Sequence, residues 1–233
     1  MQLTNYLKSQ GYDLIGGPIR NHKLLQLWVK KTFDEAELYY SNLHHAFSSS
    51  VELNEIENQA LTIQETTVND YNFNIGITVL DDILKSLGMG SLDITSLIKG
   101  GKKVTISYDN SVTKEIPSGE IANYFHNADF VHPNPDLLRN ANRNNILVIS
   151  GIVFAKNLVV EIDTEHEINA NLLAGFAAAS DGRINLSVSS DKQIKMISSS
   201  SVHFPIAVKA NRLQFQKGEF IGLKLITDDR NIF

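Results

Sequence analysis

The longest apolar run of the chain extends from Ile146 to Phe154 and is interrupted by Ser150. It is much shorter than the ~18 uninterrupted apolar residues that a membrane-spanning helix requires. A continuous apolar segment of this length is typical of a strand that is buried on both faces. The sequence therefore predicts a sheet whose central strand is covered on both sides, and it predicts no membrane-spanning helix.

Further strands are predicted along the chain, because apolar and polar residues alternate with the period of a half-buried strand. The alternating segments are Leu24–Lys31, Leu61–Glu65, Tyr71–Ile75, Val104–Tyr108, Leu158–Asp163, Ile184–Val188 and Phe204–Ala210. A helix is also possible over Leu24–Lys31. The two segments between Leu61 and Ile75 fit a hairpin. Asp109-Asn110 is expected to end one strand, and Lys217-Gly218 predicts a tight turn near the C-terminus.

Helices are predicted where apolar residues recur with a period of 3.6. They are Val79–Leu87, a helix that begins at Pro117-Ser118, a short helix around Leu137-Leu138, and Ile168–Ala179. We find no linker and no internal repeat. The 233 residues therefore predict one α+β domain.

Composition and motifs argue against several classes of function. The chain has no cysteine, which excludes disulfides, thiolate metal sites, a cysteine nucleophile and S-acylation. Nucleophile-elbow, phosphate-loop and zinc-protease motifs are missing, and the pairs Asp81-Asp82 and Asp228-Asp229 are interpreted as solvated. We therefore expect no enzyme, no cofactor and no metal. Met1–Lys8 has no basic stretch followed by an apolar one, so we expect a cytoplasmic protein.

Charge is distributed unevenly. Between Val51 and Ile98 eight acidic residues stand against the single Lys85. Basic residues then gather at Lys99, Lys102 and Lys103, and a second basic group contains Arg20, Lys23, Lys30 and Lys31. These groups are either ordinary solubilising charge or contacts for anionic lipid headgroups, which attract each nearby basic residue by about 1 kcal/mol. Nucleic acid is disfavoured, because the net charge is −5 and aromatic and basic residues do not interleave.

Ordered motifs along almost the whole chain resemble one protein family. In the first half they are Tyr6–Ile15, Leu24–Leu27, Asn42-Leu43, Phe47, Phe73–Gly88, Leu92–Ile94 and Lys99–Tyr108. In the second half they are Ile146–Val160 and Phe204–Leu213. Taken in this order, the motifs resemble those of the bacterial gasdermins.

The resemblance implies a twisted, mostly antiparallel central sheet with peripheral helices, as in a gasdermin N-terminal domain. It also implies a latent pore-forming protein that is a cytoplasmic monomer until a protease removes a short C-terminal peptide. The released domain then oligomerises, inserts β-hairpins and permeabilises the bacterial inner membrane, and the cell dies in defence against phage. The implied partners are membrane lipids, the activating protease and other copies of the chain.

Applied to this chain, the resemblance divides it into a pore-forming domain, residues 1–222, and a short tail, residues 223–233, that could be autoinhibitory. The candidate lipid contacts are Arg20, Lys23, Lys99, Lys102 and Lys103. The candidate tail anchors are Leu225, Ile226 and Phe233, and the candidate cleavage positions are Lys224, Asp229 and Arg230.

Two features of the sequence depart from the family pattern. Many bacterial gasdermins carry a lipidated cysteine near the N-terminus, which this chain lacks, and its tail is shorter than usual. Control by a partner chain, or no proteolytic control, therefore stays open. Alternating strands equally suit a soluble amphipathic sheet, so the alternative is a soluble β-rich binding module without membrane activity.

Overall fold

The computed structural model describes residues 7–15, 22–31, 34, 36–60, 101–132, 134–164, 184–190, 192–198 and 203–226. Strand β8 (Ile146–Thr164) lies at the centre of their main sheet and has two partners along each of its edges. On one edge, β11 (Phe204–Gln216) pairs with residues 147–155 and β10 (Gln193–Ser198) with residues 159–163. On the other edge, β2 (Leu27–Val29) pairs with residues 146–148 and β6 (Gly101–Glu115) with residues 151–164.

The remaining strands of this sheet pair with these partners of β8. β1 (Asp13–Leu14) and β12 (Glu219–Leu225) pair with β11, β3 (Glu37–Tyr40) with β2, β5 (Ile56–Ala60) with β6, and β9 (Ile184–Ser190) with β10. β4 (Phe47–Ser49) and β7 (Ala128–Phe130) form a small separate sheet. All strand pairs among the described residues are antiparallel. Together with the helices η1 (Leu43–His45), α4 (Ser118–His126) and α5 (Pro135–Asn142), this confirms the predicted α+β class.

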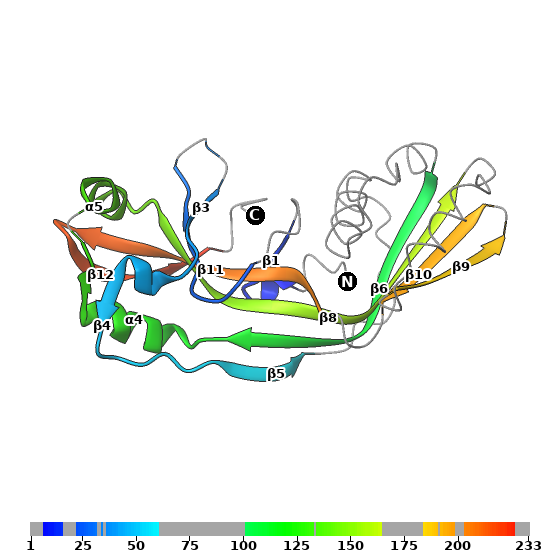
Figure 1. Cartoon of the computed structure of the whole chain (residues 1–233), viewed down its shortest axis with the longest axis horizontal. Helices are drawn as coiled ribbons and strands as arrows, with labels where there is room; N and C mark the ends of the chain where they lie inside the picture. Colours follow the sequence, from blue (N-terminus) through cyan, green and yellow to red (C-terminus); the bar gives the residue numbers. More distant parts are fainter. Residues whose placement is uncertain are drawn as a thin grey trace.

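Different helices and strands lie at the two ends of the main sheet. Helices α4 and α5 and strands β4 and β12 gather at one end, whereas β6, β8, β9 and β10 run together toward the other (Figure 1). At the helical end, Ile146, Leu147, Val148 and Ile149 are all fully buried. Ile146 and Val148 belong to one apolar cluster, while Leu147 and Ile149 belong to a second. The prediction of a strand buried on both faces is therefore confirmed for this half of β8.

The starts of helices α4 and α5 and the turn between β11 and β12 lie where the sequence predicts them. α5 begins with Pro135 after Asn134, whose side-chain oxygen accepts hydrogen bonds from the backbone N–H groups of Asp136 (2.9 Å) and Leu137 (3.3 Å). α4 begins at Ser118, directly after Pro117. Lys217 and Gly218, with φ of 52° and 86°, form the turn between β11 and β12. All three expectations are confirmed.

Three strand predictions need correction. β6 does not end at Asp109-Asn110 but continues to Glu115, because β8 and β5 pair with it there. The segments 146–154 and 158–163 form one strand, because partners are present along its length. The strand predicted over Leu24–Lys31 shortens to Leu27–Val29, since Leu25 adopts a φ of 63° that no regular strand accepts. The hairpin between Leu61 and Ile75 and the helices Val79–Leu87 and Ile168–Ala179 lie outside the described residues.

Strand β12 crosses the predicted boundary between domain and tail. Leu223, Lys224 and Leu225 pair with β11. The next residue, Ile226, donates its backbone N–H to the carbonyl of Ala210 (3.1 Å), and only 7% of its surface is exposed. Residues 223–226 are therefore integrated into the main sheet and its core.

This integration makes the effect of truncation depend on its position. A chain that ends at Gly222 loses the buried Ile226 and the last pairs of β12, so its free energy of unfolding should fall by at least about 2 kcal/mol. A chain that ends at Ile226 keeps these contacts and should be more stable than the chain that ends at Gly222. Urea unfolding followed by circular dichroism measures the difference, and equal midpoints for both truncations would contradict the prediction.

Candidate functional site at the root of the strand arm

We call β9, β10, residues 156–164 of β8 and residues 101–110 of β6 the arm. Its register aligns residues of similar polarity across four strands. The apolar rows are Val104–Ile162–Ile194–Val188 and Ile106–Val160–Met196–Leu186. The polar rows are Lys103–Asp163–Gln193–Ser190 and Thr105–Glu161–Lys195–Ser187. Because successive residues of a strand lie on opposite faces, the apolar rows share one face of the arm and the polar rows share the other.

Interactions across β8 and β10 reinforce the polar face. The Lys195 ammonium lies 2.6 Å from a Glu161 carboxylate oxygen, and the Gln193 amide donates to Asp163 over 2.7 Å. The separation of polarity weakens toward the core, where Ser107 pairs with Val159 and Val159 pairs with Ile197. The arm is thus most clearly two-faced in its outer part.

Before it reaches the arm, β8 exchanges one partner for another along one of its edges. The Ile149 N–H donates to the carbonyl of Gln26, just before β2, over 3.1 Å. The carbonyl of the next residue, Ser150, accepts from Ile116, just after β6, over 2.8 Å. On the opposite edge, β11 pairs Lys209 with Gly151 and Ala210 with Ile149, so Ser150 is the extra residue of a β-bulge. We call this place the junction.

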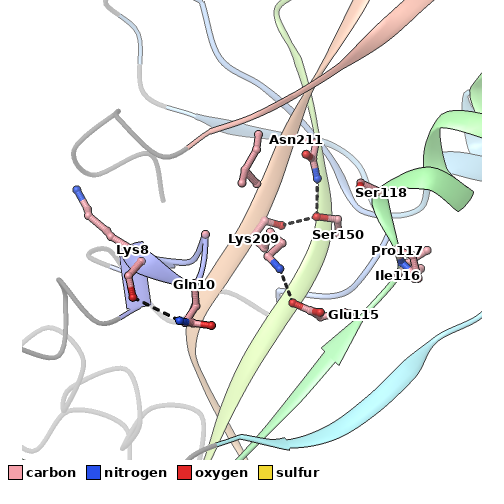
Figure 2. Close-up of a pocket in the computed structure, with 12 residues that line it drawn as sticks. Lys8, Gln10, Glu115, Ile116, Pro117, Ser118, Ser150, Lys209 and Asn211 are labelled. Atoms are coloured by element: carbon pink, nitrogen blue, oxygen red, sulfur yellow. Dashed lines mark hydrogen bonds and ion pairs between the residues drawn. The ribbon is translucent and has the colours of Figure 1, made fainter.

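Two buried polar side chains form a chain of hydrogen bonds at the junction. Asn211 donates its side-chain amide to the Ser150 hydroxyl over 2.6 Å, and that hydroxyl donates to the Lys209 carbonyl over 3.3 Å (Figure 2). Ser150 and Asn211 are 1% and 3% exposed. The Ser150 hydroxyl therefore gives the Lys209 carbonyl a partner beside the bulge, and Asn211 gives that hydroxyl a donor.

A charged cluster also lies at the junction. The Lys209 ammonium donates to Glu115 Oε1 over 2.5 Å, and the Tyr12 hydroxyl donates to the same oxygen. The ammonium also lies 4.7 Å from the centre of the Tyr12 ring. Glu115 and Lys209 both pair in register with Gly151, so their ion pair crosses β8 above a residue without a side chain. A Cβ atom on Gly151 would lie 3.0 Å from the Tyr12 hydroxyl and 3.2 Å from Lys209 Cβ. We call Tyr12, Glu115 and Lys209 the clamp.

Electrostatics keep the clamp in one protonation state. Burial alone would raise the pKa of Glu115, but the hydrogen bonds from Lys209 and Tyr12 and the charge of Lys209 outweigh it and lower that pKa. Burial, together with the hydrogen bond to Glu115 and its charge, raises the pKa of Tyr12. Both shifts favour ionised Glu115 beside neutral Tyr12. The cluster therefore suits holding segments together rather than transferring protons at neutral pH.

A cleft of about 520 Å³ opens beside the clamp. Its walls include Lys8 from the N-terminal segment, Ser118 at the start of α4, and Leu225 of β12. Glu115, Lys209, Ser150 and Asn211 also line the cleft (Figure 2). Within the described ranges, no group of three histidine, aspartate or glutamate residues could hold a metal ion. The helices in those ranges are also too short or too polar to cross a membrane.

The structure places the predicted tail anchors and lipid contacts in different regions. Leu225 lines the cleft and is 40% exposed, whereas Ile226 is buried. Lys23 is exposed in the turn before β2, and Lys102 and Lys103 belong to β6 in the arm. The cleavage candidate Lys224 is exposed within β12, opposite Arg212. Arg20, Lys99, Asp229, Arg230 and Phe233 lie outside the described residues.

Sequence reasoning missed all the polar residues of the junction. The only available signal was the interruption of the longest apolar run by Ser150, followed by Gly151. Tyr12, Glu115 and Lys209 are too far apart in the sequence for any motif to link them.

Comparison with known proteins identifies a family through its sequence model. The model of the Bacterial Gasdermin Family matches residues 15–219. A bacterial gasdermin from Bradyrhizobium tropiciagri superposes with a TM-score of 0.58 at 14% identity, over 95% of this chain and 90% of that one. The Gasdermin A3 membrane pore gives a TM-score of 0.36 at 12% identity, over 93% and 89% of the two chains. The search of curated proteins returned no match.

The lowered pKa of Glu115 predicts a pH-dependent contribution to stability. At pH 7, Glu115→Gln should lower the free energy of unfolding by about 1.5–3 kcal/mol, because two hydrogen bonds to a charged group are weakened. A carboxyl with a depressed folded-state pKa stabilises above its unfolded pKa, about 4.3, and loses this effect as pH falls through the folded value. The difference between wild type and variant should therefore shrink toward pH 3.

Urea unfolding at pH 7 and pH 3 measures both differences. Glu55→Gln is the matched control, because Glu55 pairs with Lys114 in a more exposed position. A gap between wild type and Glu115→Gln that stays constant with pH would contradict the assignment.

Proposed function

The chain belongs to the bacterial gasdermin family and is of the pore-forming gasdermin kind, and on this premise we propose how it acts. The protein is latent and cytoplasmic until proteolysis of its C-terminal tail releases it. The released chains oligomerise and insert β-hairpins into the bacterial inner membrane, which becomes permeable. The resulting cell death limits the spread of phage.

The observation that carries this proposal is the separation of polarity on the arm. Two apolar rows lie on one face and two polar rows lie on the other. A membrane-spanning strand needs about ten residues whose alternate positions face lipid and water. The arm portion of β6, residues 101–110, has this length, and its apolar rows continue through β8, β10 and β9. Such strands supply the polarity pattern that insertion requires.

The edges of the arm support an oligomeric form. Among the described strands, residues 101–110 of β6 pair only with β8, and β9 pairs only with β10. In a bilayer, each unpaired backbone group would cost several kcal/mol. Neighbouring copies that pair along these two edges would remove this cost, so insertion proceeds with oligomerisation.

The position of β12 guides the proposal for activation. Lys224 lies inside a paired strand, and a protease needs local opening before it can cut there. Asp229 and Arg230 follow Ile226, which is the last buried residue in the described part of the chain, and we favour cleavage at one of these two positions. The removed segment then acts through residues beyond Ile226, and Phe233 is its remaining candidate anchor.

Dye release from anionic vesicles tests the proposal. We expect release from a chain that ends at Ile226 and none from the full chain. In the active form, Ile106→Lys should abolish release, because a lysine at the centre of a bilayer costs about 2–4 kcal/mol per strand and every copy carries it. Thr105→Lys on the adjacent polar row is the matched control and should keep activity.

The outcomes separate the alternatives. Release from both chain lengths would keep the pore and reject the tail as inhibitor. Equal loss in both lysine variants would contradict the assigned faces. Silence from every form would favour the soluble β-rich binding module.

Lipid attraction gives a separate test. Lys102 and Lys103 lie at the outer end of the arm in β6, and each nearby lysine adds about 1 kcal/mol of attraction to an anionic surface. Lys102→Glu combined with Lys103→Glu should weaken vesicle binding at least about tenfold. Arg139→Glu combined with Lys217→Glu changes the same charge at the helical end and should leave binding unchanged. Vesicle sedimentation measures both, and unchanged binding of the first pair would remove the proposed role.

A further inference from the structure

We propose that the clamp of Tyr12, Glu115 and Lys209 is a second restraint on the arm, separate from the C-terminal tail. It fastens the N-terminal segment, residues 7–15, across the root of β6, and opening it loosens the arm. The effect on membrane activity rests on the proposed pore-forming function, whereas the effect on the arm in solution does not.

The first argument is where the three residues come from. Tyr12 precedes β1, Glu115 is the last residue of β6, and Lys209 stands at the bulge in the pairing of β11 with β8. Their hydrogen bonds share one oxygen atom, Glu115 Oε1. One carboxylate thus connects the N-terminal segment, the arm strand β6 and the core strand β11.

The second argument is how the N-terminal segment reaches the end of β6. β1 has two residues. A small apolar cluster joins Leu7 and Tyr12 to Val153 and Ala207, and Ile15 packs into a neighbouring cluster. Tyr12 is 4% exposed, and its hydroxyl reaches Glu115 at the end of β6. Loss of the hydroxyl would therefore remove this link between the N-terminal segment and β6.

The third argument is the position of Glu115. Directly after it, Ile116 donates to the Ser150 carbonyl and the chain leaves the sheet for α4. If β6 moves relative to β8, the contacts of Glu115 at the end of β6 have to change. The ion pair between Glu115 and Lys209 crosses β8 above Gly151 and connects the strands on both edges of β8, so it resists such movement.

The preceding residue of β6, Lys114, provides a matched comparison. Lys114 pairs with Glu55 over 2.6 Å and with Glu57 over 3.5 Å. The side chains of this network are 35–59% exposed, against 24% and 30% for Lys209 and Glu115. Exposed pairs contribute little, so breaking the Lys114 network should not loosen the arm.

Hydrogen exchange of the full chain in solution tests the restraint. Tyr12→Phe removes only the hydroxyl, and Gly151→Ala opens the clamp sterically without removing any of its groups. Both should accelerate exchange about tenfold at residues 7–15 and also at residues 101–115 and 151–164. Lys114→Met is the control and should change none of these segments. Acceleration confined to residues 7–15, or equal acceleration in the control, would overturn the proposal.

Vesicle leakage then tests the consequence. In the chain that ends at Ile226, Tyr12→Phe should reduce the concentration needed for half-maximal release by up to about tenfold, because the open state is more populated. Faster exchange in the arm with unchanged leakage would overturn the role in activation. If the wild-type chain releases no dye in any form, the proposed pore function fails, while the exchange data still decide whether the clamp restrains the arm.

Discussion

The architecture depends on one irregularity, the bulge at Ser150 in the central strand. On one edge of β8 the partner changes there from β2 to β6, and on the other edge the register with β11 shifts by one residue. Such a site would be costly in a buried strand if its polar groups were unpaired. The Ser150 hydroxyl donates to the Lys209 carbonyl and accepts from the Asn211 side chain, so these buried polar groups are paired where β8 continues toward the arm.

The junction lets a single strand serve two environments. Before it, residues 146–149 are covered on both faces by apolar clusters. Beyond it, residues 158–163 alternate in polarity and align with matching rows on β6 and β10. A chain of the bacterial gasdermin family thereby carries a rigid core and a two-faced strand arm on one continuous backbone. Ion pairing over Gly151 places a charged restraint where these two parts meet.

Much of the fold could be predicted from local patterns. The apolar run at Ile146, the proline-marked starts of α4 and α5, and the Lys217-Gly218 turn all act through neighbouring residues, and all agree with the structure. The predicted end of β6 at Asp109-Asn110 was wrong, because two strands distant in sequence pair with it and their hydrogen bonds outweigh local turn preference. The clamp could not be predicted, since its members come from positions 12, 115 and 209.

The sequence by itself therefore determined the class of the fold, the buried half of β8 and the alternating polarity of the arm strands. These follow from periodicity, which every strand carries in its own residues. Only the tertiary structure decided the register of those strands, the burial of Ile226 and the meeting of Tyr12, Glu115 and Lys209. Each depends on contacts between distant segments, and contacts of that kind form only when the whole sheet is assembled.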